Sequence, residues 1–471
     1  MAWLKSGRLH YAAGITALFL LIFVALRAIF YFGFSEVGDT LHPEPAVLYE
    51  TLYIGIKFDL RLALILSLPV FLLTWLPRYN VATTPALRRL SRLYIGAALL
   101  IILLFYIIDF GHYAYLGIRM NSTVVRFFED LSISANMMWE SYPVVWVTLA
   151  WLFTTAAALW LVKRLERRTL DRQQPALPKL QIVTGSVIIT VLVLLGLLGR
   201  FTDINLENPV PLRWNHAFFS GNDTVSALGI NPVLFFYDTF EQREPGYDMD
   251  EVRHYYPAIA DYLGVTDRDE QQFNYDRTIT AGPQKLAFDR PPNIIFIMLE
   301  SLGASRVGAY NNPLETTPVL DMMAENGWLF KHFYVPVSGT SRTVFASITG
   351  MPDVSSVKTA TRNPLIAEQH IALNYLTGHD MFYFIGGNAG WANMSALIQN
   401  SIKGVRLYQE DNFTEPLVDV WGISDLGLFR EVDKVLSKQP QDRPFFAYIQ
   451  TAANHRPFTI PEDNDGFQVD E

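Results

Sequence analysis

The residues with the clearest potential for chemistry are a carboxylate and a hydroxyl forty positions apart, Glu300 and Thr340. Glu300 ends the run Asn293-Ile-Ile-Phe-Ile-Met-Leu-Glu, and Thr340 lies within Ser338-Gly-Thr-Ser-Arg-Thr-Val-Phe345. A threonine hydroxyl becomes a useful nucleophile when metal coordination lowers its proton affinity. Hard divalent cations prefer oxygen ligands such as a carboxylate and an alkoxide. We therefore predict that Glu300 and Thr340 bind one divalent cation and that Thr340 is a nucleophile.

The residues around Thr340 favour a phosphate-bearing substrate. Thr340 follows Gly339 and precedes a helix-like stretch at 343–349. The positive end of a helix dipole attracts phosphate, and glycine allows the backbone to approach it closely. Taken alone, a glutamate after an apolar strand or a Gly-Thr pair is more often a loop start or a helix cap. The rest of the chain decides between these interpretations.

Five segments are apolar over roughly the 20 residues that a membrane-spanning helix needs. They lie near residues 12–34, 53–76, 94–116, 144–162 and 182–198. The second contains Lys57, Asp59 and Arg61 near its start, so we expect that end close to the membrane interface. Asp59 and Asp109 could mark an ion path, but we expect paired or interfacial charges.

Positive charge predicts the orientation of these segments. Basic residues precede the first segment, follow the second and separate the fourth from the fifth, namely Lys5, Arg8, Arg78, Arg88, Arg89, Arg92, Lys163, Arg164, Arg167, Arg168, Arg172 and Lys179. All of them fall on one side if the N-terminus is cytoplasmic. We therefore expect a multi-pass protein of the cell (inner) membrane, with everything after Gly199 on the extracytoplasmic, periplasmic side.

Composition excludes several other classes of protein. Half of the residues are hydrophobic and only 18% are charged, whereas a soluble domain carries about 25% charged residues. The net charge of −9 argues against nucleic acid as a partner. The chain has no cysteine, which excludes disulfides, zinc–thiolate sites and a cysteine nucleophile.

The external half begins with a connector at 200–290, aromatic at first and then acidic. It could rest on the lipid surface or pack against the domain that follows. From residue 291 we predict strands at 293–299, 328–335, 381–385 and 445–450, and helices at 317–326 and 424–437. This alternation predicts an α/β sheet with helices on both faces and functional groups at the C-terminal strand ends. The predicted domains are 1–199, 200–290 and 291–471.

Nearly the whole chain resembles the lipoteichoic acid synthase family of phosphoglycerol transferases, within the alkaline phosphatase and sulfatase superfamily. The resemblance rests on the segments starting at Asn293, Thr316-Thr-Pro-Val-Leu-Asp, Gly339-Thr-Ser-Arg-Thr-Val, Gly386-Gly-Asn-Ala-Gly-Trp-Ala-Asn and Thr451-Ala-Ala-Asn-His-Arg-Pro-Phe. It implies five transmembrane helices followed by an extracytoplasmic sulfatase-like domain. It also implies that Glu300 binds metal, that Thr340 is the metal-bound nucleophile and that His455 and Trp391 bind the substrate headgroup. Arg342 could pair with a phosphate or only border the site.

The resemblance implies a membrane transferase that depends on Mn²⁺ or Mg²⁺. Thr340 would attack a phospholipid donor such as phosphatidylglycerol, release diacylglycerol and pass phosphoglycerol to a glycan or polymer acceptor. The family's remaining metal ligands, an Asp-His pair, do not occur after residue 300. We expect them after Glu471, which would make the sulfatase-like domain truncated here.

Three alternatives remain open. A phosphoethanolamine transferase would use the same threonine with another headgroup pocket. A sulfatase would need a Cys or Ser within a Cys/Ser-x-Pro-x-Arg motif, and the segment Ser338-Gly-Thr-Ser-Arg342 lacks that proline. A catalytically inactive relative that senses lipid or lipopolysaccharide is the third.

Overall fold

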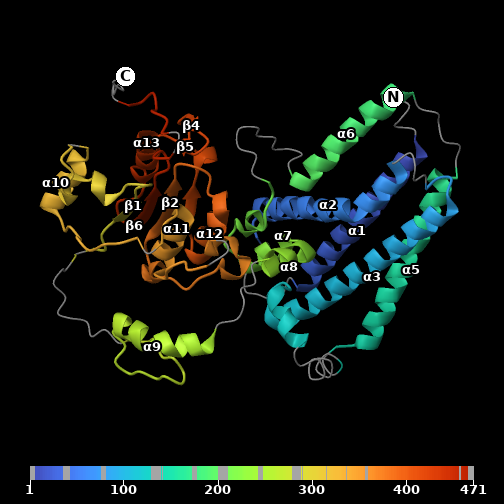
Figure 1. Cartoon of the computed structure of the whole chain (residues 1–471), viewed down its shortest axis with the longest axis horizontal. Coiled ribbons are helices and arrows are strands. Elements are labelled where there is room, and N and C mark those ends of the chain that lie inside the picture. Colours follow the sequence, from blue (N-terminus) through green and yellow to red (C-terminus); the bar gives the residue numbers. More distant parts are fainter. Residues whose placement is uncertain are drawn as a thin grey trace.

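A computed structural model describes most of the chain. The described residues are 6–34, 43–75, 81–128, 139, 142–171, 178–199, 211–241, 248–277, 288, 290–314, 316–335, 337–355, 359–455 and 458–464. Lys5, Arg78 and Arg172, which entered the orientation prediction, lie outside these residues. Helices fill the N-terminal half, and a sheet with its helices fills the C-terminal part (Figure 1).

The N-terminal half contains a helix at each of the five predicted apolar segments. These are α1 (Gly7–Phe34), α2 (Pro45–Trp75), α3 (Pro85–Leu116), α5 (Val144–Thr169) and α6 (Lys179–Leu198). Within the described residues, α1, α3 and α5 are long and apolar enough to cross a membrane. Large side chains such as Phe32, Trp146 and Phe153 point outward, each at least 74% exposed. Such exposure of apolar surface is typical of helices that face lipid, so these helices indicate a membrane protein.

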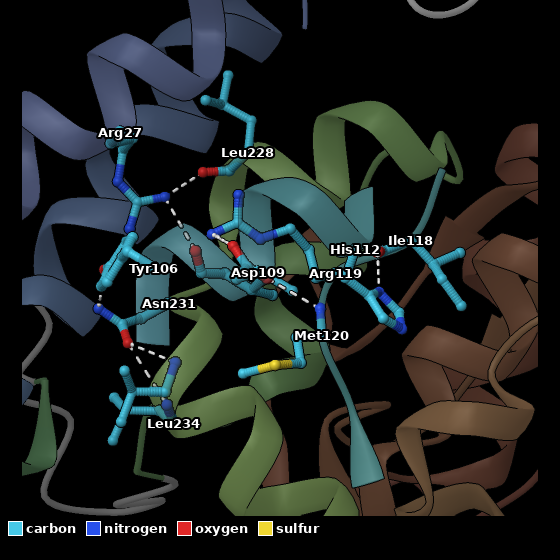
Figure 2. Close-up of polar contacts among 12 residues, drawn as sticks. Arg27, Tyr106, Asp109, His112, Ile118, Arg119, Met120, Leu228, Asn231 and Leu234 are labelled. Atoms are coloured by element: carbon cyan, nitrogen blue, oxygen red, sulfur yellow. Dashed lines mark hydrogen bonds and ion pairs between the residues drawn. The ribbon is translucent and has the colours of Figure 1, made fainter. Parts of the chain in front are cut away.

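A buried ion pair joins the first two helices. Arg27 of α1 and Asp59 of α2 lie 2.7 Å apart, with side chains 7% and 0% exposed. Arg27 also donates to the backbone carbonyls of Gly55 and Ile230 at 3.0 and 3.1 Å. Asn231 donates to Asp59 at 2.9 Å and to the Tyr106 hydroxyl of α3 at 3.0 Å. This cluster therefore ties α1, α2 and α3 to residues 230–231, well beyond them in sequence. Figure 2 shows Arg27, Tyr106 and Asn231 of this cluster.

A second buried pair closes the end of α3. Arg119 lies 3.1 Å from Asp109, which also accepts a hydrogen bond from the Met120 backbone at 2.8 Å (Figure 2). The Arg119 guanidinium is 4.1 Å from the centre of the Phe30 ring of α1. The prediction that Asp59 and Asp109 are paired charges is confirmed.

The connector packs between the helical half and the sheet. It contains η3 (Trp214–Phe218), α7 (Asp223–Gly229) and α8 (Pro232–Glu241). Trp214 and Phe235 share one apolar cluster with Phe58 of α2 and Ala396 of α12 (Met394–Ser401). Hydrogen bonds from Asn215 to Ser395 (3.0 Å) and from Gln399 to the Phe219 carbonyl (2.8 Å) strengthen this contact. This part of the connector therefore bridges the two halves, while α9 (Met249–Leu263) has a small core of its own.

A parallel sheet organises the C-terminal part. Its strands are β1 (Ile294–Met298), β2 (Asp380–Ile385), β3 (Arg406–Tyr408) and β6 (Phe445–Gln450), in the order β1-β6-β2-β3. Alternate residues of β2 face opposite cores. Tyr383 packs with α11 (Thr340–Thr349) and α12, whereas Phe382 and Phe384 pack with α13 (Asp425–Leu436). The predicted α/β sheet with helices on both faces is confirmed.

The remaining elements border the sheet. They are α10 (Pro318–Asn326), the hairpin β4 (Leu417–Asp419) and β5 (Gly422–Ile423), and the short 3-10 helices η4 (Ala304–Arg306), η5 (Gly308–Tyr310), η6 (Ala360–Arg362), η7 (Pro364–Ile366), η8 (Ala372–Tyr375), η9 (Trp391–Asn393) and η10 (Glu410–Asn412). A further 3-10 helix, η2 (Ser122–Phe128), belongs to the helical half, where it follows α3 and contacts α8.

The predicted strand at 328–335 is wrong. Its described residues contain no strand, and Trp328, Phe330 and Phe333 are 83%, 66% and 75% exposed. An apolar run becomes a strand only when a neighbouring strand accepts its hydrogen bonds. Within the described sheet β1 is an end strand that pairs with β6, and 328–335 has no place in that order.

The Arg27–Asp59 pair makes a first testable prediction. Asp59→Asn leaves a buried guanidinium without its counter-charge, a change that costs about 3–5 kcal/mol. We expect a clear fall in the thermal unfolding temperature of the detergent-solubilised protein. Arg253→Gln, which breaks the exposed pair between Arg253 and Asp250, is the control and should change stability little. Equal unfolding temperatures for Asp59→Asn and the parent would contradict the role of the pair.

Glu431 of α13 makes a prediction about pH. Burial opposes ionisation of Glu431, but hydrogen bonds from Lys434 and Thr414 outweigh it and lower its pKa from 4.5 to about 2. A lowered pKa stabilises the fold above about pH 4.5, and this contribution is lost as the pH falls toward 2. Glu431→Gln should therefore lower the unfolding temperature most at neutral pH and progressively less between those limits. Asp433→Asn removes a carboxylate from the exposed face of the same helix and is the matched control. Equal losses of unfolding temperature in Glu431→Gln at pH 2 and pH 7 would contradict the prediction.

Candidate functional site

The C-terminal ends of β1 and β6 hold the backbone around Glu300. The Thr451 amide donates to the Met298 carbonyl at 3.1 Å, continuing the pairing of the two strands. The Glu300 amide donates to the Thr451 hydroxyl at 2.8 Å, and the Asn454 side chain donates to the Glu300 carbonyl at 3.2 Å. Glu300 is therefore fixed at the sheet edge where parallel α/β folds place their functional groups.

The Glu300 carboxylate is the centre of the cluster. Its Oε2 accepts a hydrogen bond from the Thr340 hydroxyl at 2.9 Å. Its Oε1 accepts one from the Ser301 hydroxyl at 2.7 Å and lies 3.5 Å from Nε2 of His455. The structure therefore brings together Glu300, Thr340 and His455, which were predicted from widely separated positions.

Thr340 is the first residue of α11. The residue before it, Gly339, has φ 110° and ψ 130°, a conformation that side chains with a Cβ rarely adopt. The helix is anchored on the sheet by Val344, Phe345 and Ile348, which are all buried. This packing fixes the hydroxyl at the positive end of the helix, next to the carboxylate.

Ser301 has a strained backbone. Its φ of 53° is in the left-handed region, which is uncommon for residues other than glycine, asparagine and aspartate. This conformation accompanies the hydrogen bond from its hydroxyl to Glu300. Strain of this kind concentrates at functional sites, so Ser301 is a further member of the cluster.

Trp421 contacts His455, and the sequence did not predict Trp421 as part of the site. Its ring stacks on His455 with centroids 4.1 Å apart and an interplanar angle of 22°. The hairpin turn that carries Trp421 fits closely against the loop after β2, where the Trp421 carbonyl leaves no room for a Cβ on Gly387. The only sequence signal was an aromatic residue next to glycine, in Val420-Trp421-Gly422.

Arg342 uses its guanidinium to hold a loop. It donates to the carbonyls of Asp353 and Ser355 at 2.9 and 2.8 Å. The side chain is only partly exposed and fixes residues 353–355 beside α11. Its contact with a phosphate stays a prediction.

Trp391 lies at the start of η9 and is 43% exposed. The next residues, Ala392 and Asn393, both have positive φ, at 50° and 62°. Ser395, just beyond, accepts the hydrogen bond from Asn215 of the connector. In the described part of the chain no contact joins Trp391 to the Glu300 cluster, so its headgroup role also stays a prediction.

The atoms of this cluster are of the types that bind a hard divalent cation. Glu300 and Thr340 provide adjacent oxygens, and an imidazole lies beside them. Within the described residues, no three His, Cys, Asp or Glu side chains form a group that could hold a metal.

The carboxyl group of Asp425 lies near this cluster. Burial raises the pKa of Asp425, and the charge of Glu300 raises it further, against the lowering effect of backbone hydrogen bonds from Ala453 and Ala452.

Comparison with known proteins matches residues 292–469 to the sulfatase family. Human (Homo sapiens) arylsulfatase A is 39% identical over 105 residues, covering 20% of this chain and 21% of the enzyme. The lipoteichoic acid synthase-like protein YvgJ of Bacillus subtilis (strain 168) is 25% identical over 226 residues, covering 44% of this chain and 36% of YvgJ. The matched parts therefore span about a fifth of the arylsulfatase and about a third of YvgJ.

Among solved structures, a protein of the alkaline phosphatase superfamily from Vibrio parahaemolyticus matches 49% of this chain and 55% of its own. Its sequence identity is 25% and its TM-score is 0.37. The C-terminal part of this chain is therefore similar to the sulfatase family over residues 292–469, and it is joined to an N-terminal half whose long apolar helices indicate a membrane protein.

Proposed function

We propose that the protein is a membrane-bound phosphotransferase that moves phosphoglycerol from a phospholipid, such as phosphatidylglycerol, to an extracytoplasmic glycan or polymer acceptor. One observation carries this proposal: the Thr340 hydroxyl, at the N-terminus of α11, donates to Glu300 at 2.9 Å. This pairs a nucleophile with a metal-binding type of carboxylate on a sulfatase-type scaffold. The similarity to the lipoteichoic acid synthase-like YvgJ supports the choice of donor.

The proposed topology has five spans, with α2 and α6 crossing the membrane alongside α1, α3 and α5. An N-terminus in the cytoplasm then places residues after 199 outside the cell (inner) membrane. The charged residues of α2 support this proposal because Asp59 is paired with Arg27, which reduces the cost of burying it. The division into domains at 199 and 290 belongs to the same proposal.

The proposed reaction has two steps. Thr340 Oγ1 gives up its proton and forms a bond to phosphorus as the bond to the diacylglycerol oxygen breaks; that oxygen takes up a proton, so diacylglycerol leaves and phosphoglycerol stays on the threonine. An acceptor hydroxyl then gives up its proton and attacks the same phosphorus, and the threonine oxygen leaves and takes up a proton, which restores Thr340. Glu300 orients the Thr340 hydroxyl, and the N-terminus of α11 stabilises the phosphate charge. When bound by Glu300 and Thr340, a Mn²⁺ or Mg²⁺ ion would supply charge that lowers the proton affinity of the hydroxyl.

The same residues bear on the alternatives. A phosphoethanolamine transferase would use Thr340 in the same way and differs only in the headgroup that it binds. A sulfatase needs a cysteine or serine that matures to formylglycine, and the nucleophile position here is a threonine. An inactive lipid sensor would have no need for the hydrogen bond between Thr340 and Glu300.

Thr340→Ala should abolish release of labelled diacylglycerol from phosphatidylglycerol by the purified full-length protein, because the attacking oxygen is gone. Thr340→Ser keeps that oxygen and should retain partial turnover. Thr343→Ala is the matched control, since the Thr343 hydroxyl bonds to the Gly339 carbonyl of its own helix at 3.1 Å. Unchanged turnover in Thr340→Ala would rule out the proposed nucleophile.

Trp421→Ala should raise the KM for phosphatidylglycerol while leaving the fold intact, because the stacked ring positions His455, the predicted headgroup contact. Aromatic contacts of this kind are worth about 0.5–1.5 kcal/mol, so we expect a rise in KM of roughly 2- to 10-fold. Trp421→Phe preserves a stacking ring and should restore most of the parent KM. A purely structural role predicts instead a lower unfolding temperature with an unchanged KM.

A further inference from the structure

A pocket of about 240 Å³ lies beside the candidate site. Its walls are Ser301, Arg306, Asn454, His455 and Phe458. Ser301 and His455 are also the residues that contact Oε1 of Glu300, whereas Thr340 contacts Oε2. The pocket is therefore next to the nucleophile, on the other side of the shared carboxylate.

Arg306 gives this pocket a positive charge. It ends η4, a short turn after β1, and its side chain is exposed. Among the residues that the structure describes, its guanidinium has no hydrogen bond or ion pair, although its backbone carbonyl accepts a bond from Thr316 at 2.6 Å. A free guanidinium offers planar paired N–H donors that match a phosphate.

The neighbouring pocket has the opposite character. It has a volume of about 370 Å³, shares Asn454 and Phe458, and is lined by the carboxyl groups of Asp425 and Asp463. Asp463 already accepts a hydrogen bond from Arg430 at 3.2 Å. An anionic group would therefore be drawn to the Arg306 pocket and repelled from its neighbour.

Backbone strain also marks the Arg306 pocket. Two of its lining residues have left-handed backbones, Ser301 with φ 53° and Phe458 with φ 63°. Positions of this kind are costly for residues with a side chain and cluster at ligand-binding sites. Phe458 is half-exposed and gives the pocket an apolar wall.

We propose that this pocket is a subsite for a phosphate group of the substrate and that Arg306 is the residue that recognises it. Asn454 lies in the same wall and contributes an amide group. The inference rests on the proposed function, because it places a phosphate beside Thr340. Glycerol phosphate and phosphoethanolamine both carry the phosphate that Arg306 would bind, so the subsite is assigned to the phosphate and not to the rest of the headgroup.

The test of binding uses a protein that cannot turn over. Glycerol 1-phosphate and phosphoethanolamine are titrated into the full-length Thr340→Ala protein in detergent by calorimetry. Adding Arg306→Gln should raise the Kd for glycerol 1-phosphate roughly 10- to 100-fold, the range for losing a hydrogen bond to a charged group. Arg306→Lys should lose less. Arg290→Gln is the matched control, because it removes the same charge before β1, at the other end of that strand.

Equal affinity for glycerol 1-phosphate in the Arg306→Gln and Arg290→Gln proteins would overturn the proposal. Weaker binding of glycerol 1-phosphate by the Arg306→Gln protein, with unchanged binding by the Arg290→Gln protein, would support the proposal.

Whether the phosphate belongs to the donor or to the acceptor is tested by measuring KM in proteins that keep Thr340. If Arg306→Gln raises the KM for phosphatidylglycerol relative to the parent protein when no acceptor is present, the subsite binds the donor lipid. If Arg306→Gln raises only the KM for a phosphate-bearing acceptor, the subsite binds the acceptor. If Arg306→Gln changes neither KM, the proposed subsite is overturned. If the parent protein releases no diacylglycerol but its binding depends on Arg306, the proposed function fails and the phosphate subsite stands.

Discussion

The site depends on the parallel pairing of β1 with β6 and on the hydrogen bonds that extend it. The bond from the Glu300 amide to the Thr451 hydroxyl and the bond from Asn454 to the Glu300 carbonyl join two segments about 150 residues apart. Because both strands end at the same edge, the carboxylate from one loop and the imidazole from the other come within 3.5 Å. The third group, Thr340, lies at the start of α11, and the packing of α11 against the same sheet places the Thr340 hydroxyl next to Glu300.

The contacts between the helical half and the sheet follow a related physical constraint. Charges buried among apolar helices must be paired, and the Arg27–Asp59 pair also binds the backbone of residues 228–230. The same connector packs Trp214 against α2 and α12. α12 directly follows the loop with Trp391. The polar cluster in the helical half is therefore linked through a continuous set of contacts to α12 and to the turn that carries Trp391.

Much of the site could be predicted because its signals are local. An apolar run that ends in glutamate indicates a buried strand with a carboxylate at its end, and Gly339 before Thr340 indicates a helix start with an unusual backbone. Trp421 and Arg306 could not be found in this way. Trp421 becomes significant only because a hairpin folds it onto His455. Arg306 becomes significant only because its turn meets the loop after β6 to form a pocket.

The sequence by itself determined the apolar helices, the alternating strands and helices of the C-terminal part, and the residues able to do chemistry, because each depends on near neighbours in the chain. It misjudged 328–335, since an apolar run does not reveal whether a partner strand is present. Only the tertiary structure decided which groups meet: that Asp59 pairs with Arg27, that Glu300 contacts both Thr340 and His455, and that Arg342 holds a loop. Such contacts form between segments distant in the chain, and their geometry is set by packing and strand register, which local patterns do not encode.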